Sequence, residues 1–196
     1  MRNTLIILLS GAVLAVGACN KHEPTTADNG ASDLNIATDN MSVDNGAMAN
    51  SAAASPLSAQ GFANAAAASD RFEIESSKLA ATQASSSAVK KFAEKMIAAH
   101  TESTAKLKTT ASGLSTPVTP DDTLSADQQA KLDSLKGLNG AGFDSAYASA
   151  QVDAHQAALD GLKNYGASGD TPEFKTFANG LVPTVTAHLN MAKGLK

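Results

Sequence analysis

Apolar side chains recur at helical spacing through most of residues 58–196, and this periodicity constrains the fold more than any other feature of the chain. The segment 89–107 is an example, since four of its apolar residues share one stripe: Val89, Phe92, Met96 and Leu107. Strands rely on aromatic and β-branched side chains, whereas this chain is only 4% aromatic and has no Trp. The pattern therefore predicts an all-α fold.

Serine clusters, glycines and prolines divide this region into four long helices and one short helix. The expected ranges are 58–84, 87–112, 125–136, 143–165 and 171–196. Ser125 and Gln128 have the spacing of a capping box at the start of the short helix. A four-helix bundle would bury the apolar stripes, and the connection of about 30 residues between the second and third long helices favours a ferritin-like crossover. A plain up-and-down bundle is the alternative.

The start of the chain has the layout of a bacterial lipoprotein signal. Arg2 precedes an uncharged run that ends at Ala18, and hydrophilic sequence without a stop-transfer pattern follows. The run leads into VGAC, which resembles a lipobox, and its Cys19 is the only cysteine in the chain. We therefore expect residues 1–18 to be a cleaved signal peptide and Cys19 to carry a lipid that anchors the protein to a membrane. An ordinary signal peptide or a single membrane anchor is the alternative.

Residues 19–57 separate the lipidated Cys from the predicted bundle domain, residues 58–196. The segment is rich in Asn, Asp, Ala, Ser and Thr, so we expect a disordered acidic tether. Asn20 rather than Asp follows the Cys, which by resemblance to sorting in enteric bacteria favours the outer membrane over the inner one. From residue 58 onward, 13 basic and 14 acidic side chains nearly balance without a basic cluster, which argues against nucleic acid as a partner.

Three of the four histidines lie on the apolar stripes of three different long helices. At the rise of an α-helix, His100, His155 and His188 lie about 20, 18 and 25 Å from the starts of their helices. Glu73 and Glu75 lie about 15–20 Å before the turn that ends the first helix. All five residues are therefore expected in the middle third of the bundle.

Glu and His side chains that project inward from facing helices are how helix bundles build metal sites. Neutral imidazole and carboxylate ligands suit Zn, Fe, Mn or Cu. Asp144, Asp153 and Tyr147 are the candidates for hydrogen bonding to the ring nitrogens that the metal does not use. The alternative is a buried polar layer that fixes the register of the helices without binding a metal.

No catalytic constellation stands out in the sequence. A di-iron bundle needs Glu-x-x-His on two helices, but Ile97 and Val152 stand three residues before His100 and His155. The chain also lacks a glycine-rich phosphate loop and a nucleophile elbow. The sequence does not decide whether the protein is an enzyme, but the lack of a catalytic signature argues against one.

Several motifs, taken in order, resemble a bacterial family known as domain-of-unknown-function family 4142. They are FEIESSKLA (72–80), VKKFAEKMIAAH (89–100), GFDSAY (142–147), AHQAAL (154–159) and LVPTVTAHLNMAK (181–193). The residues that match the family's characteristic positions are Glu73, Glu75, His100, Phe143, Asp144, His155, Pro183 and His188. The resemblance implies a ferritin-like fold and a secreted or lipid-anchored protein, and it implies no particular activity.

These patterns together predict a cell-envelope lipoprotein with a ferritin-like bundle that faces the periplasm and binds a transition metal. Storage, buffering or stress protection would be its role. The alternative is a metal-free helical module that binds another envelope protein or stabilises the envelope.

Overall fold

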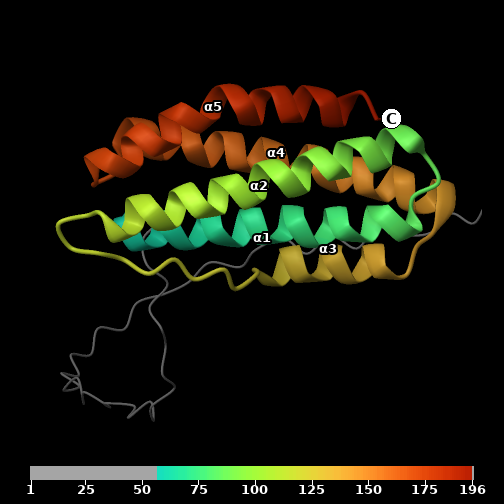
Figure 1. The fold of residues 1–196 in the computed structure, drawn as a ribbon, viewed down its shortest axis with the longest axis horizontal. Coiled ribbons are helices and arrows are strands. Elements are labelled where there is room, and N and C mark those ends of the chain that lie inside the picture. The colour runs from blue at the N-terminus through green and yellow to red at the C-terminus, as the bar shows by residue number, and fades with distance from the viewer. Residues whose placement is uncertain (1–56, 196) are drawn as a thin grey trace, which may run out of the picture. The chain divides into compact units, whose positions relative to one another are not determined.

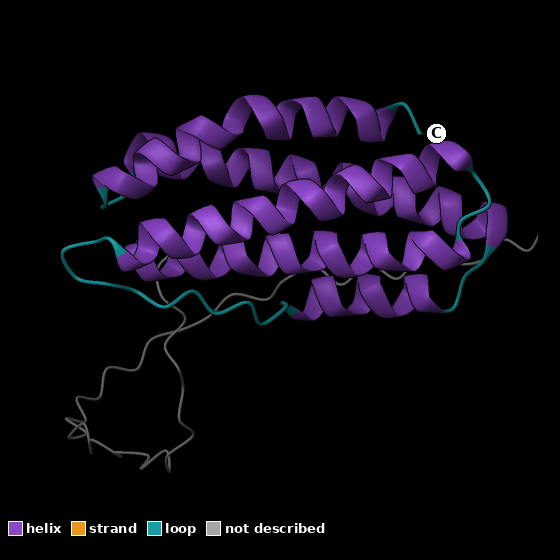
Figure 2. Cartoon of the chain, in the orientation of Figure 1, coloured by secondary structure: helices purple, strands orange, loops and turns teal. Residues whose placement is uncertain are grey.

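The computed structural model describes residues 57–195, and this part of the chain is built from α-helices without a strand (Figure 2). The helices are α1 (Ala59–Gln83), α2 (Ser87–Ser112), α3 (Ala126–Lys136), α4 (Gly140–Ser168) and α5 (Pro172–Lys193). The prediction of an all-α bundle is therefore confirmed. Helix α5 continues through Pro183, which lies on its exposed side.

Serine side chains cap the N-termini of the first three helices. The hydroxyl oxygens of Ser58 and Ser86 accept hydrogen bonds from backbone N–H groups in the first turns of α1 and α2. Ser125 and Gln128 form the predicted capping box at the start of α3. Helix α4 begins at Gly140, three residues earlier than expected, because Gly140 takes a φ of 61° and turns the chain within one residue.

The order of the helices in space follows from contacts at the two ends of the bundle. Near the start of α4, Asp144 accepts hydrogen bonds from the N–H groups of Ser85 and Ser86 in the α1–α2 turn. After the end of α4, the N–H of Asp170 donates to the carbonyl of Leu57, just before α1. Helices α2 and α4 therefore run in the same direction, and α1 and α5 run opposite to them (Figure 1).

The segment between α2 and α4 consequently crosses the length of the bundle, with α3 packed against α1 and α4 (Figure 1). Gln83 at the end of α1 fixes α3, because its Nε2 lies within hydrogen-bond distance of three carbonyl oxygens at and just after the end of that helix. These belong to Leu135, Lys136 and Leu138. The connection is thus a crossover, the arrangement that the sequence favoured over an up-and-down bundle.

Two apolar clusters fill opposite ends of the bundle. One packs Phe62 and Tyr165 with the start of α5, and the other packs Phe72, Phe92 and Phe143 near the start of α4. Of the eight buried polar residues that the structure describes, seven form a central polar layer between the two clusters, and Ser77, the eighth, pairs with Tyr147. The seven are Asp70, Glu73, Ser76, His100, Gln151, His155 and His188. The fold therefore buries a group of polar side chains within an apolar core, where each one needs a partner.

No described helix has both the length and the hydropathy to cross a membrane. The predicted signal peptide, Cys19 and nearly all of the predicted tether lie outside the described residues.

Candidate metal centre

Three imidazole rings, from α2, α4 and α5, meet in the central polar layer. The ring centroids of His100 and His155 are 5.7 Å apart, those of His100 and His188 are 5.9 Å apart, and those of His155 and His188 are 5.5 Å apart. One ring nitrogen of each lies within 4.8 Å of those of the other two. The side chains are buried, with exposed fractions of 7%, 1% and 8% in sequence order. The structure thus brings the three predicted histidines together.

The ring of His155 has a defined tautomer. Its Nδ1 lies 2.8 Å from the backbone carbonyl oxygen of Gln151, one turn earlier on α4. A carbonyl oxygen can only accept, so Nδ1 carries the hydrogen and the lone pair is on Nε2. This Nε2 is buried and has no hydrogen-bond partner among the described residues. Burial lowers the pKa of His155 to about 4, so the ring is neutral near pH 7 and its lone pair is free to bind a metal.

The ring of His100 is held by a carboxylate that the sequence did not single out. Its Nδ1 lies 2.7 Å from Oδ1 of Asp70 on α1, and its Nε2 is buried without a partner in the described part of the chain. Burial on its own would lower the pKa of His100, but the hydrogen bond with Asp70 and the negative charges of Glu73 and Asp70 outweigh it and raise the pKa. Asp70 is therefore a functional candidate that periodicity alone had missed.

The third ring, that of His188, is also neutral near pH 7. Burial, reinforced by positive charge on His100 and Lys95, lowers its pKa to about 4. Its Nδ1 is buried and has no hydrogen-bond partner within residues 57–195. An unsatisfied buried polar atom costs about 1–3 kcal/mol, so three such nitrogens in one place are an arrangement that a bound ion would stabilise.

Glu73 lies beside the histidines rather than among their free nitrogens. Its Oε1 is 3.6 Å from Nδ1 of His155, on the opposite edge of the ring from the unpartnered Nε2. Burial raises the pKa of Glu73 to about 7, against the opposing effects of His100 and of a hydrogen bond from Gln151. The carboxyl group is thus poised near neutral pH, where it can supply a compensating negative charge.

Glu75 and Asp144, two further predicted site residues, lie elsewhere. Glu75 is on the outer surface, where its Oε1 is 2.8 Å from Nε of Arg71. Asp144 is at the end of the bundle, where its carboxylate accepts hydrogen bonds from the N–H groups of Ser85 and Ser86 and from the hydroxyl of Ser85. These contacts give Asp144 a role in the α1–α2 turn.

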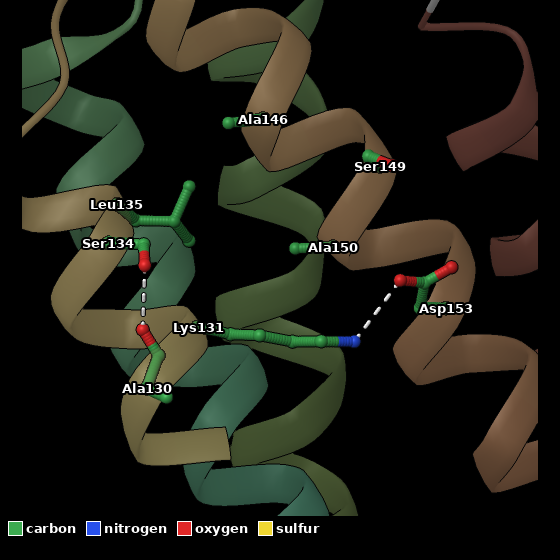
Figure 3. A pocket seen from close by; sticks show the side chains of 8 residues that line it. All are labelled: Ala130, Lys131, Ser134, Leu135, Ala146, Ser149, Ala150 and Asp153. Carbon is green, nitrogen blue, oxygen red and sulfur yellow. Dashed lines mark hydrogen bonds and ion pairs between the residues drawn. The ribbon is translucent and has the colours of Figure 1, made fainter. Parts of the chain in front are cut away.

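Asp153 and Tyr147 likewise make their hydrogen bonds away from the three rings. Asp153 is exposed and pairs with Lys131 at 3.1 Å across a surface groove between α3 and α4 (Figure 3). Tyr147 is buried, and its hydroxyl lies 2.7 Å from that of Ser77. The groove is lined mainly by alanines, serines and one leucine, and none of the three histidines lines it.

Comparison with known proteins relates this chain to solved structures of a protein named CopM. The Cu(II)-bound form of CopM has a TM-score of 0.58 and 19% identity, over 70% of this chain and 94% of CopM. The Ag-bound form has a TM-score of 0.56 and 18% identity, over 70% and 93%, and the Cu(I)-bound form has 0.57 and 19%, over 70% and 94%. At such low identity the likeness shows a shared fold. No curated protein matches the chain. Residues 44–195 match the family described as a domain of unknown function, DUF4142, so the chain belongs to that family.

Proposed function

We propose that this protein binds a copper ion through Nε2 of His100, Nε2 of His155 and Nδ1 of His188. One observation carries the proposal. These three nitrogens come from three different helices, and each is buried without a hydrogen-bond partner among the described residues. The three residues also offer nitrogens within 4.8 Å of one another. When a copper ion is bound, it supplies the electron-pair acceptor that all three lone pairs lack.

The spacing suits a single ion. Nitrogens that bind one ion at about 2.0 Å would lie about 3.4 Å apart, closer than the 4.8 Å within which ring nitrogens of the three histidines lie, so the rings would move toward one another on binding. Three protein ligands also leave one position of a four-coordinate ion open to solvent or another ligand. The helices that hold the ligands supply the fixed scaffold.

Copper fits this ligand set best among the four metals that the sequence suggested. Three imidazoles without a carboxylate are a poor site for Mn, which prefers oxygen. Cu(II) also stands at the top of the affinity order for divalent metals of the first row, above Zn and Fe. CopM, which has the same fold, is known in Cu(I)-bound, Cu(II)-bound and Ag-bound forms. Copper storage or buffering is the role that we infer.

We further propose that the bundle works in the cell envelope as a lipoprotein, anchored to the outer membrane through Cys19 and facing the periplasm. The support is the uncharged run that follows Arg2 and ends at Ala18, together with the VGAC motif that ends in the only cysteine. A copper-buffering bundle on a tether would act on copper ions that enter this compartment.

The unpartnered ring nitrogens support a metal site over the alternative of a metal-free module. A polar layer that only fixes helix register is stable when each member is hydrogen-bonded. In the described part of the chain, the buried atoms without a partner include one nitrogen each of His100, His155 and His188 as well as Oε2 of Glu73.

Copper titration of the purified protein tests the proposal. A ligand that binds only the folded state at 100 times its Kd stabilises that state by about 2.7 kcal/mol. We expect one copper per chain and a rise in Tm of roughly 5–10 °C, which a chelator reverses. His155→Ala should abolish the rise, whereas Glu75→Gln, at the surface, should keep it. Wild-type protein that binds no copper and shows no rise would favour the metal-free module.

A further inference from the structure

A buried carboxylate lies directly behind one ring of a site whose three proposed ligands are all imidazoles. We propose that Asp70 positions His100 for metal binding and supplies negative charge that favours a divalent ion over a monovalent one. This inference rests on the copper site proposed above and assigns its charge selectivity to a residue that does not touch the metal.

The geometry of the pair supports the positioning role. Oδ1 of Asp70 lies 2.7 Å from Nδ1 of His100, within the range of a charge-assisted hydrogen bond. An ionised carboxylate can only accept, so Nδ1 donates, and in the neutral ring the lone pair is on Nε2, which has no partner among residues 57–195. Carboxylates that accept from the far nitrogen of a ligating histidine are a recurring feature of metal sites.

Asp70 is itself fixed in place. Its Oδ2 accepts a hydrogen bond of 3.1 Å from the hydroxyl of Thr104. This hydroxyl also lies 2.9 Å from the carbonyl oxygen of His100. The carboxylate on α1 is thus tied to α2 at two points, and it is only 5% exposed. The carboxylate is therefore held in place before an ion binds.

The charge of Asp70 should act differently on ions of different charge. Glu73 approaches His155 only to 3.6 Å, so Asp70 is the carboxylate joined to a ligand ring by a short hydrogen bond. Coulomb energy scales with the product of the charges, so Asp70 attracts a divalent ion twice as strongly as a monovalent ion at the same point. If the loss of this charge weakens monovalent binding n-fold, it should weaken divalent binding about n²-fold. A role limited to geometry would weaken both equally.

Zn(II) and Ag(I) are suitable probes, because both have filled d shells and neither changes oxidation state during a titration. We expect Asp70→Asn, which keeps the shape of the side chain, to weaken Ag(I) binding about tenfold and Zn(II) binding about a hundredfold. The reduction potential of bound copper should rise by about 59 mV for each tenfold loss of selectivity. Competition titrations against metal indicators measure the affinities, and voltammetry measures the potential.

Two control variants separate charge from geometry. Asp153→Asn removes a carboxylate from the surface partner of Lys131, and it should leave the Zn(II)-to-Ag(I) ratio of affinities within twofold of wild type. Thr104→Val keeps the carboxylate of Asp70 and removes one of its anchors, so both affinities should fall by the same factor. If circular dichroism shows that Asp70→Asn does not fold, Asp70→Ser, which is smaller and keeps a hydroxyl acceptor, takes the same test.

The outcomes distinguish this inference from the proposed function. If wild-type protein binds neither probe nor copper, the three-histidine site itself is wrong. If wild-type protein binds both probes and the variant at Asp70 weakens them equally, or weakens neither, the site stands and the assignment of charge selectivity to Asp70 is wrong.

Discussion

Acid should destabilise the metal-free protein between pH 6.5 and pH 4.5 because of two buried histidines. In the folded state the pKa of His155 and that of His188 are each about 4, against 6.5 for an unperturbed histidine. Below pH 6.5 the unfolded chain therefore binds two protons that the folded protein does not. Each histidine costs about 1.4 kcal/mol of unfolding free energy per pH unit in this window.

Glu73 opposes this loss. Its folded pKa of about 7 lies above the unperturbed value of 4.5, so below pH 7 the folded state binds a proton that the unfolded chain binds only near pH 4.5. Protonation of Glu73 thus adds about 1.4 kcal/mol per pH unit while the two histidines remove about 2.8. The pKa of His100 is raised, so both states bind its proton below pH 6.5 and it adds no slope. The net loss from pH 6.5 to 4.5 is about 2–3 kcal/mol.

Urea unfolding at pH 6.5, 5.5 and 4.5 in the presence of a chelator measures this loss. Glu73→Gln cannot gain the compensating proton, so its loss over the same range should reach about 5 kcal/mol. Glu75→Gln makes the same chemical change at the surface and should keep the wild-type slope. Constant or rising stability of the wild-type protein toward pH 4.5, or a shallower slope in Glu73→Gln, would refute the reasoning.

Two other variants test separate parts of the account. Asp144→Ala removes the acceptor for Ser85 and Ser86 at the α1–α2 turn, so the free energy of unfolding should fall by about 2 kcal/mol while copper affinity stays unchanged. Equilibrium denaturation measures the loss of unfolding free energy, and copper titration measures the affinity. Weaker copper binding would mean that Asp144 acts on the metal. Cys19→Ala should leave an unlipidated protein. If that variant still fractionates with membranes and matures to the wild-type mass, the lipoprotein proposal is wrong.

The helices were predictable because their signals are local. Ser125 and Gln128 are three residues apart and form their capping box irrespective of the rest of the chain. The position of the three histidines along the bundle axis also followed from the rise per residue of an α-helix. The choice between a crossover and an up-and-down bundle depends on contacts between residues far apart in the sequence, such as that between Asp170 and Leu57.

The partners of the histidines could not be predicted, because they depend on how each helix is rotated about its axis. Glu73 and Glu75 are two residues apart, so they diverge around α1, and only Glu73 is buried. Asp70 lies on the buried side of α1 but is 30 residues from His100, and no local pattern links the two. The rotation of α1 against α2 decides such a pair, and it is set by packing of the whole bundle.

X-ray absorption at the copper K-edge tests the central claim most directly. Protein loaded with one equivalent of copper should show three nitrogen scatterers at about 2.0 Å with the outer-shell pattern of imidazole. The same spectrum of the variant with His100, His155 and His188 all changed to Ala should lose that pattern. A copper shell of sulfur or of oxygen alone, or an imidazole pattern that survives in the triple variant, would contradict the assignment of copper to these three rings.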